Sequence, residues 1–152
     1  NAIPLPDQQF DTVFSTQTIE HVADHQGLVN EAWRLLRPGG VFILSGPMYW
    51  HLHEEPHDYF RFTRHGFAHI LGRAGFEVLE IVPNGGMWAT TGQSLIHSLL
   101  NVRPGSRVLR VFRALFFRLQ IHCLTNLLFG WLDGIDFNPI NTMNYVVVAR
   151  RN

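Results

Sequence analysis

The segment from Phe10 to Pro47 constrains the fold more than any other part of the chain. It reads FDTVFSTQTIEHVADHQGLVNEAWRLLRPGGVFILSGP. The β-branched and aromatic run Asp11–Thr16 predicts a strand that is buried on both faces. Apolar residues then recur at helical spacing after Asp24, a residue type that caps helix N-termini. We expect Pro38-Gly39-Gly40 to end this helix, because proline cannot continue a helix and glycine accepts a left-handed turn. A strand follows at Val41–Leu44, so the segment predicts a parallel βαβ unit.

A second unit follows the first along the chain. Thr63 is the expected N-cap of a helix that Gly75 closes, and the alternating run Phe76–Val82 predicts a strand. Asn144–Ala149 predicts a last strand near the C-terminus. The residues between these two strands include an apolar, arginine-bearing stretch, Ser94–Leu132, which we expect to form a helical insertion. The fold class predicted is therefore α/β.

Charge is distributed unevenly along the chain. The formal net charge over 152 residues is zero, which argues against a nucleic-acid partner. Residues 81–132 nevertheless hold five arginines and no acid. The one cysteine, Cys123, fits a reducing compartment, so we expect a cytoplasmic protein. The charge-free run Leu119–Leu132 is too short to span a bilayer, which takes about 20 residues.

The arginines of this stretch predict a basic amphipathic helix over Arg103–Arg118. Two interpretations remain open for it. The helix binds an anionic membrane surface or a lipid-linked substrate, which would make the protein membrane-peripheral. Alternatively, it is a lid helix that packs on the domain through the apolar stretch Leu124–Trp131 and turns its arginines to solvent.

The densest polar cluster is the stretch from His51 to Arg61, HLHEEPHDYFR. Residues 53–57 spell H-E-x-x-H, a zinc-binding pattern that works only on a helix. Pro56 removes a backbone amide and pushes Glu55 out of the helical region, so we expect no such zinc site. A loop metal site formed by His51, His53 and His57 is the alternative; the expectation adopted is that no metal is bound.

Instead, we expect this loop to lie at the mouth of a substrate pocket. There His57 or Tyr59 accepts a proton from the attacking group, and Arg61 and Asp58 bind the substrate. The competing interpretation is that Asp58 and Arg61 pair with each other to hold the loop. His21, which follows the first strand, is a third candidate base, with a role in organising its own loop as the alternative.

Taken in order, IPLPDQQFDTVFSTQTIEHV, LLRPGG, VFILSGP and the later stretches HEEPHDYFRFTRHGFAHILGRAGFEV and YVVVARR resemble the class I S-adenosylmethionine-dependent methyltransferases, in the UbiE-like group. The resemblance implies a Rossmann-like sheet with strand order 3-2-1-4-5-7-6, of which this chain supplies strands 4 to 7. It therefore implies a fragment without the family's glycine-rich cofactor loop. Residues 1–84 would form the α/β units, residues 85–135 a helical insertion or lid, and residues 136–152 the final strand of one partial domain.

The resemblance also implies S-adenosylmethionine as cofactor. Ala2 and Ile3 would lie beside the adenine, and Ser15, Thr16 and Gln17 would line the methionine part, at the carboxyl end of strand 4. The predicted function is methyl transfer to a small, lipid-linked or sugar-linked acceptor. The alternative is a non-catalytic remnant or interaction module that self-associates through the bare edge of strand 4.

Overall fold

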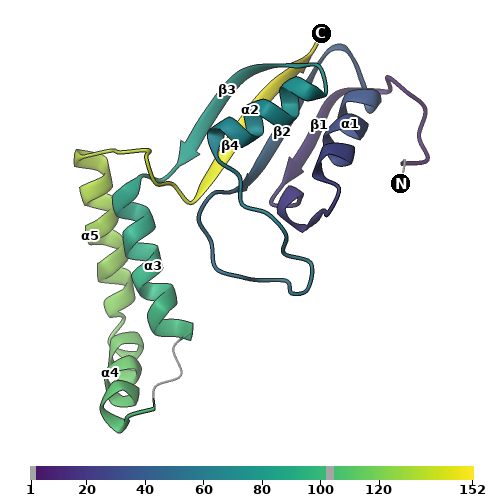
Figure 1. Cartoon of the computed structure of the whole chain (residues 1–152). Coiled ribbons are helices and arrows are strands. Elements are labelled where there is room, and N and C mark those ends of the chain that lie inside the picture. The colour runs from purple at the N-terminus through teal and green to yellow at the C-terminus, as the bar shows by residue number, and fades with distance from the viewer. Residues whose placement is uncertain (1–2, 102–104) are drawn as a thin grey trace. The chain divides into compact units, whose positions relative to one another are not determined.

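The computed structural model describes residues 3–101 and 105–152 and forms two compact units. One unit comprises residues 1–84 and 143–152, and we call it the α/β unit. The other comprises residues 85–142, and we call it the helical unit. The elements of both are labelled in Figure 1.

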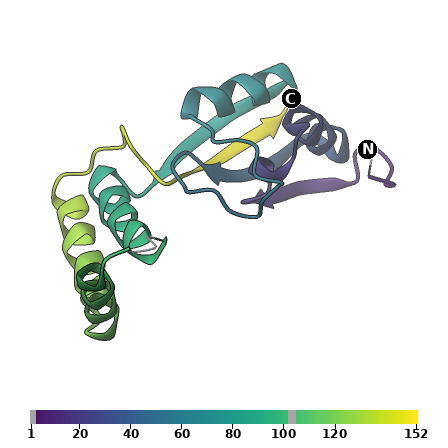
Figure 2. The same cartoon turned by 60° about the horizontal axis from the view of Figure 1, so that its bottom comes forward.

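The α/β unit is built on a four-stranded mixed sheet with the order β1-β2-β4-β3 (Figure 1 and Figure 2). β1 (Phe10–Thr16) and β2 (Leu36–Pro47) are parallel. β4 (Asn144–Arg151) runs antiparallel to both β2 and β3 (Phe76–Asn84). This order is the 4-5-7-6 half of the expected sheet, including its antiparallel last strand, so the predicted Rossmann-like topology is confirmed for these four strands.

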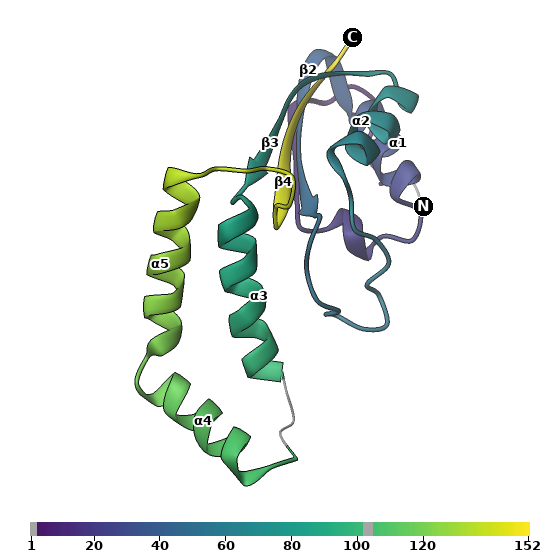
Figure 3. The same ribbon diagram turned by 60° about the vertical axis from the view of Figure 1, so that its left-hand side comes forward.

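Two helices cover one face of the sheet (Figure 3). α1 (His25–Leu35) begins at Asp24, whose carboxylate accepts a hydrogen bond from the Gly27 amide at 2.9 Å. α2 (Arg64–Arg73) begins at Thr63, which caps the Gly66 amide in the same way at 3.1 Å. Both predicted caps are confirmed. The core between helices and sheet includes Val29, Ala32, Phe42, Leu44, Phe67, Ile70, Leu71, Val147 and Ala149.

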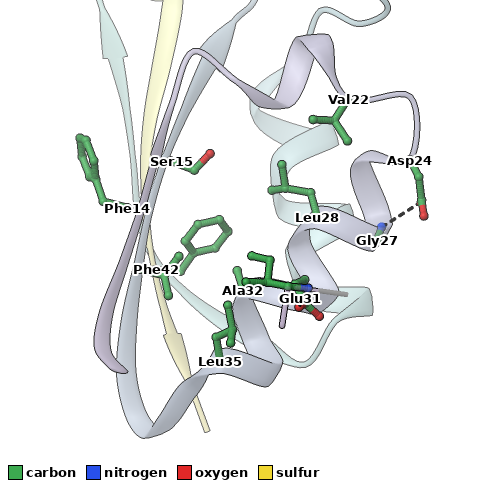
Figure 4. Close-up of a pocket in the computed structure, with 12 residues that line it drawn as sticks. Phe14, Ser15, Val22, Asp24, Gly27, Leu28, Glu31, Ala32, Leu35 and Phe42 are labelled. Carbon is green, nitrogen blue, oxygen red and sulfur yellow. Dashed lines mark hydrogen bonds between the residues drawn. The ribbon is translucent and has the colours of Figure 1, made fainter. Parts of the chain in front are cut away.

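Two details of the first βαβ unit differ from the prediction. β1 is not buried on both faces. Phe14 is 68% exposed, because it points away from the face that α1 and α2 cover (Figure 3 and Figure 4), and β1 has one neighbouring strand, β2, within the described residues. The helix also ends at Leu35, before Pro38-Gly39-Gly40. Leu36 is already extended and fully buried, and residues 37–40 bulge out of the β1–β2 pairing, which resumes at Val41.

The helical unit consists of α3 (Met87–Asn101), α4 (Arg107–Arg118) and α5 (Ile121–Ile135). α3 and α5 lie side by side (Figure 1 and Figure 3), and a Cβ atom on Gly92 would come within 2.6 Å of the Phe129 side chain. The described part of the predicted basic helix is α4; Arg103 lies outside the described residues. Within residues 3–101 and 105–152, no helix is both long and apolar enough to cross a membrane.

Candidate functional site

A largely apolar cavity of about 540 Å³ lies beside β1, β2 and α1 in the α/β unit (Figure 4). Ile3 and Ser15, both predicted to contact the cofactor, line it. Figure 4 shows Phe14 on the opposite side of β1 from Ser15. The other lining residues are Val13, Val22, Asp24, Gly27, Leu28, Glu31, Ala32, Leu35 and Phe42.

The two acids of this cavity are already bound by the chain itself. Asp24 caps α1, and the Glu31 carboxylate accepts hydrogen bonds from the Ile3 amide at 2.6 Å and from Arg34 at 2.6 and 2.9 Å. Arg34 is the main reason why the pKa of Glu31 falls to about 2, so this carboxylate stays charged at neutral pH. The cavity therefore offers apolar walls and the Ser15 hydroxyl to a ligand.

The other predicted cofactor residues are arranged differently. Thr16 and Gln17 are tied to the neighbouring strand: Thr16 Oγ1 lies 2.7 Å from Ser45 Oγ, and Gln17 Nε2 donates to the same oxygen at 3.2 Å. Neither residue lines the cavity of Figure 4. Gln17 has a left-handed φ of 47°, a conformation that non-glycine residues seldom adopt and that clusters at functional sites. Ala2 lies outside the described residues.

A second hollow, of about 530 Å³, lies at the carboxyl end of β1. We call it the histidine hollow; its lining residues are Gln17, Glu20, His21, His53, Glu54 and His57. The loop between β2 and α2 forms one side of it. Hydrogen bonds to backbone carbonyls hold this loop to the short helix η1 (Ile19–His21). The Tyr59 amide donates to the Glu20 carbonyl at 2.9 Å, and His21 Nδ1 lies 2.7 Å from the His57 carbonyl oxygen.

The three predicted catalytic side chains are brought together around this hollow. His21 and His57 line it, and the Tyr59 hydroxyl lies 2.9 Å from His57 Nδ1. His57 and Tyr59 are both exposed, so each is accessible to a ligand. Residues 53–57 form a loop and not a helix, so the prediction that H-E-x-x-H is not a helical zinc motif here is confirmed.

Asp58 and Arg61, the predicted substrate-binding pair, bond to each other. The guanidinium donates to both carboxylate oxygens, at 2.6 and 2.8 Å, and to the carbonyls of Trp50, His51 and Phe60. These five bonds use all five N–H groups of an arginine. Arg61 also holds the pKa of Asp58 well below its usual range, because it bonds to the charged form. In this arrangement the pair holds the loop, and substrate binding by either residue stays a prediction.

Glu20 is a functional candidate that the predicted site residues do not include. Its side chain is completely buried, and neither carboxylate oxygen has a hydrogen-bond partner among the described residues. The sequence signal for it is an acid in the apolar setting of Ile19 and Val22, next to a histidine. Only the fold reveals that the loop after β2 covers it.

Comparisons with known proteins agree with the topology. The family profile described as a methyltransferase domain matches residues 1–44, which include β1, α1 and the start of β2. Over 45 residues the chain is 51% identical to a protein of Mycolicibacterium smegmatis named probable S-adenosylmethionine-dependent methyltransferase, covering 30% of this chain and 18% of that protein. It is 39% identical over 46 residues to a dimethylglycine N-methyltransferase of Parasynechococcus marenigrum, covering 30% of this chain and 16% of that enzyme.

Solved structures match over nearly the whole chain at low identity. The crystal structure of the 4+2 cyclase SpnF superposes with a TM-score of 0.57 at 15% identity, covering 99% of this chain and 52% of that one. This likeness shows the fold alone. The chain thus spans about half of that structure, and its matched segments cover less than a fifth of the two curated relatives. The profile match and the two sequence relatives show that part of this chain is similar to methyltransferases, and the solved structures show that its fold is shared with proteins of that kind.

Proposed function

We propose that the protein transfers a methyl group from S-adenosylmethionine to a small acceptor. The observation that carries this is the identity of 51% over 45 residues to a protein named as such a methyltransferase. The family profile places the match on residues 1–44, the segment that supplies most of the wall of the apolar cavity. Methyl transfer is an in-line displacement that depends mainly on holding donor and acceptor in line. Ser15, the last residue but one of β1, brings the wall of this cavity close to the carboxyl end of the strand, where open α/β sheets bind ligands.

Two of the five proposed cofactor residues have direct geometric support. Ile3 and Ser15 line the apolar cavity, where Ile3 would contact the adenine and Ser15 the methionine part. Thr16 and Gln17 act from the end of β1, with Ser45 fixing their side chains. Ala2 completes the proposed set.

For the acceptor, we propose a small molecule or a lipid-linked or sugar-linked group that enters at the histidine hollow. Gln17 lines that hollow and also belongs to the proposed cofactor residues, so it would lie between the cofactor and the acceptor. His57, with Tyr59 bonded to its Nδ1, or His21 would take the proton of an attacking oxygen or nitrogen. Asp58 and Arg61 would position the acceptor through the loop that they hold.

Calorimetric titration with S-adenosylmethionine tests the cofactor part. We expect saturable micromolar binding, and Ser15→Leu should weaken it at least tenfold by filling the cavity. Phe14→Leu is the matched control, because Phe14 points to the opposite side of the same strand (Figure 4). A folded chain that binds no S-adenosylmethionine would favour the second candidate function, a non-catalytic interaction module.

The observation behind that second function is the edge of the sheet. β1 pairs on one side only within the described residues, and it exposes 68% of Phe14. An exposed apolar edge strand is a template for pairing with another chain, here a second copy. Sedimentation velocity on wild type and Phe14→Lys would show a concentration-dependent dimer that the charge abolishes; a monomer at all concentrations would exclude self-pairing.

We also propose that the helical unit contacts an anionic membrane surface. α4 carries four arginines, and α4 and α5 together expose large apolar side chains, among them Val108 at 77%, Leu127 at 71% and Trp131 at 62%. A basic amphipathic helix with adjacent Leu, Phe and Trp is typical of interfacial binding. Such a location would bring a cytoplasmic enzyme to a lipid-linked acceptor.

Co-sedimentation with vesicles tests the membrane proposal. Binding to vesicles that contain phosphatidylserine should exceed binding to neutral vesicles, and Arg107→Glu with Arg110→Glu should abolish the excess. Arg64→Glu with Arg73→Glu, on α2 of the α/β unit, is the control of equal charge change. Equal binding to both kinds of vesicle would contradict the electrostatic part.

A further inference from the structure

The orphaned Glu20 carboxylate in the histidine hollow faces two imidazoles. One donor atom from each of Glu20, His21 and His53 lies within 4.8 Å of the other two. Glu20 Oε1 and His21 Nε2 are 3.9 Å apart, and the two imidazole rings meet edge to face with centroids 4.8 Å apart. A fully buried carboxylate without a hydrogen bond is strongly unfavourable unless a positive charge compensates it.

Within residues 3–101 and 105–152, no arginine donates a hydrogen bond to the Glu20 carboxylate, and its neighbour at ion-pair distance is the His21 imidazole, at 3.9 Å. Arg61 interacts with Glu20 electrostatically but donates no hydrogen bond to it. All of its N–H groups are donated to Asp58 and to three loop carbonyls, as described above. Arg61 therefore has no N–H group left for Glu20, and both oxygens of the Glu20 carboxylate are available to bind another cation.

The two histidines are oriented as metal ligands usually are. His21 has its Nδ1 2.7 Å from the His57 carbonyl oxygen. His53 has its Nδ1 3.1 Å from the His51 carbonyl oxygen and 3.4 Å from Asp58 Oδ2. Oxygen acceptors at Nδ1 fix the tautomer that carries its lone pair on Nε2, and ligating histidines almost always have such a partner. His21 Nε2 thus faces Glu20 with its lone pair at 3.9 Å, and the same tautomer leaves the Nε2 lone pair of His53 available to a metal.

We propose that Glu20, His21 and His53 form a zinc site in the histidine hollow. Two imidazole nitrogens and one carboxylate oxygen form one of the ligand sets found in open zinc sites. In these sites the fourth position is left for water or another ligand. A tetrahedral ion with bonds of about 2.0–2.1 Å requires donors about 3.4 Å apart. His53 lies in the loop between exposed neighbours, Leu52 and Glu54, so a small adjustment of its side chain closes the set around the ion.

This site differs from both metal patterns visible in the sequence. It takes one imidazole from the loop set His51, His53 and His57, and it adds two residues from η1 that lie more than thirty positions earlier. The proposal does not depend on methyl transfer, because it rests on the contacts of Glu20, His21 and His53 and its tests measure zinc binding. A zinc ion bound there makes His21 a ligand, which leaves His57 as the proposed base.

Zinc binding by the full chain tests the proposal. The chain, stripped with chelator, is titrated with ZnCl₂ in competition with a chromophoric chelator, and we expect one ion per chain. Glu20→Gln and His53→Asn should each weaken binding at least about 100-fold, because each removes a ligand, and losing only a hydrogen-bond partner of a ligand already costs about 10–100-fold. His69→Asn is the control, since His69 is an exposed histidine on α2.

A second readout separates a metal site from a merely buried acid. Co²⁺ in place of Zn²⁺ should give the intense visible absorption of tetrahedral coordination, lost in Glu20→Gln. Thermal melting with and without ZnCl₂ shows whether each variant is folded, and zinc should raise the melting temperature of wild type and not of Glu20→Gln. The proposal is overturned if the folded wild type binds no stoichiometric zinc, or if Glu20→Gln binds it as tightly as wild type does.

Discussion

The α/β unit buries many of its apolar side chains, whereas the helical unit leaves most of its large apolar side chains exposed. In the α/β unit, α1 and α2 bury one face each against the sheet, and side chains such as Val29, Phe67 and Leu71 are fully enclosed. In the helical unit, α5 is the most apolar helix of the chain, yet none of its residues is buried. Apolar composition alone therefore does not determine whether a helix is buried. The helix also needs a second apolar surface to pack against.

The reason lies in what each helix has to pack against. A sheet offers a continuous apolar face, which receives Phe67, Ile70 and Leu71 of α2 together. α5 contacts α3 and α4, and it comes close to α3 at Gly92, where a Cβ atom would lie 2.6 Å from the Phe129 side chain. The remaining apolar surface of α4 and α5 is what the membrane proposal above requires.

The largest expected effect comes from removing a core ring in the α/β unit. Phe67→Ala should lower the free energy of unfolding by about 3–5 kcal/mol, because it deletes a fully buried ring and leaves a cavity against Phe62 and Tyr145. Urea denaturation followed by circular dichroism measures the change. A loss below about 1 kcal/mol would mean that the α/β unit is not the better packed of the two.

A smaller effect is expected at Arg151, the buried end of β4. Its guanidinium donates to the carbonyls of Trp33 and Leu36 and lies 3.6 Å above the Trp33 ring. Arg151→Met keeps much of the side-chain volume and removes the charged donors, so we expect a loss of roughly 2 kcal/mol. Arg150→Met, at an exposed neighbouring position, is the control and should change stability little, because its ion pair with Glu77 is solvent-exposed. Equal losses in the two variants would contradict the role of Arg151.

The fold was largely readable from local patterns. Asp24 and Thr63 predicted where two helices begin, and the alternating and β-branched runs predicted all four strands of the sheet. These features are local, because caps and periodicity depend on neighbours in sequence. The exposure of Phe14 did not follow from the run Asp11–Thr16, which predicts a strand buried on both faces; it depends on which face of the sheet the helices cover. Glu20 was missed for a related reason: its burial and its meeting with His53 depend on how the loop after β2 returns over η1, and no local pattern encodes that contact.

Two helix caps at the same position, one in each unit, compare the two units. Asp24 caps α1 through the Gly27 amide at 2.9 Å, and Ser106 caps α4 through the Leu109 amide at 3.2 Å. Asp24→Ala should cost about 1 kcal/mol of the α/β unit's stability, since α1 is part of its core. Ser106→Ala should instead speed hydrogen exchange only in the first turn of α4, as measured by mass spectrometry. The comparison fails if Ser106→Ala accelerates exchange in β2 or β4.

The smallest effect on stability is expected at Leu127, and it is the most informative about the helical unit. Leu127 is 71% exposed, so Leu127→Gln removes little buried surface and should change the free energy of unfolding by less than about 0.5 kcal/mol. If the exposed face binds membranes, the same variant should weaken sedimentation with anionic vesicles, because a leucine side chain no longer enters the lipid interface. A stability loss above 1 kcal/mol would show that Leu127 is buried by protein in solution, and the helical unit would then be a packed element like α1 and α2.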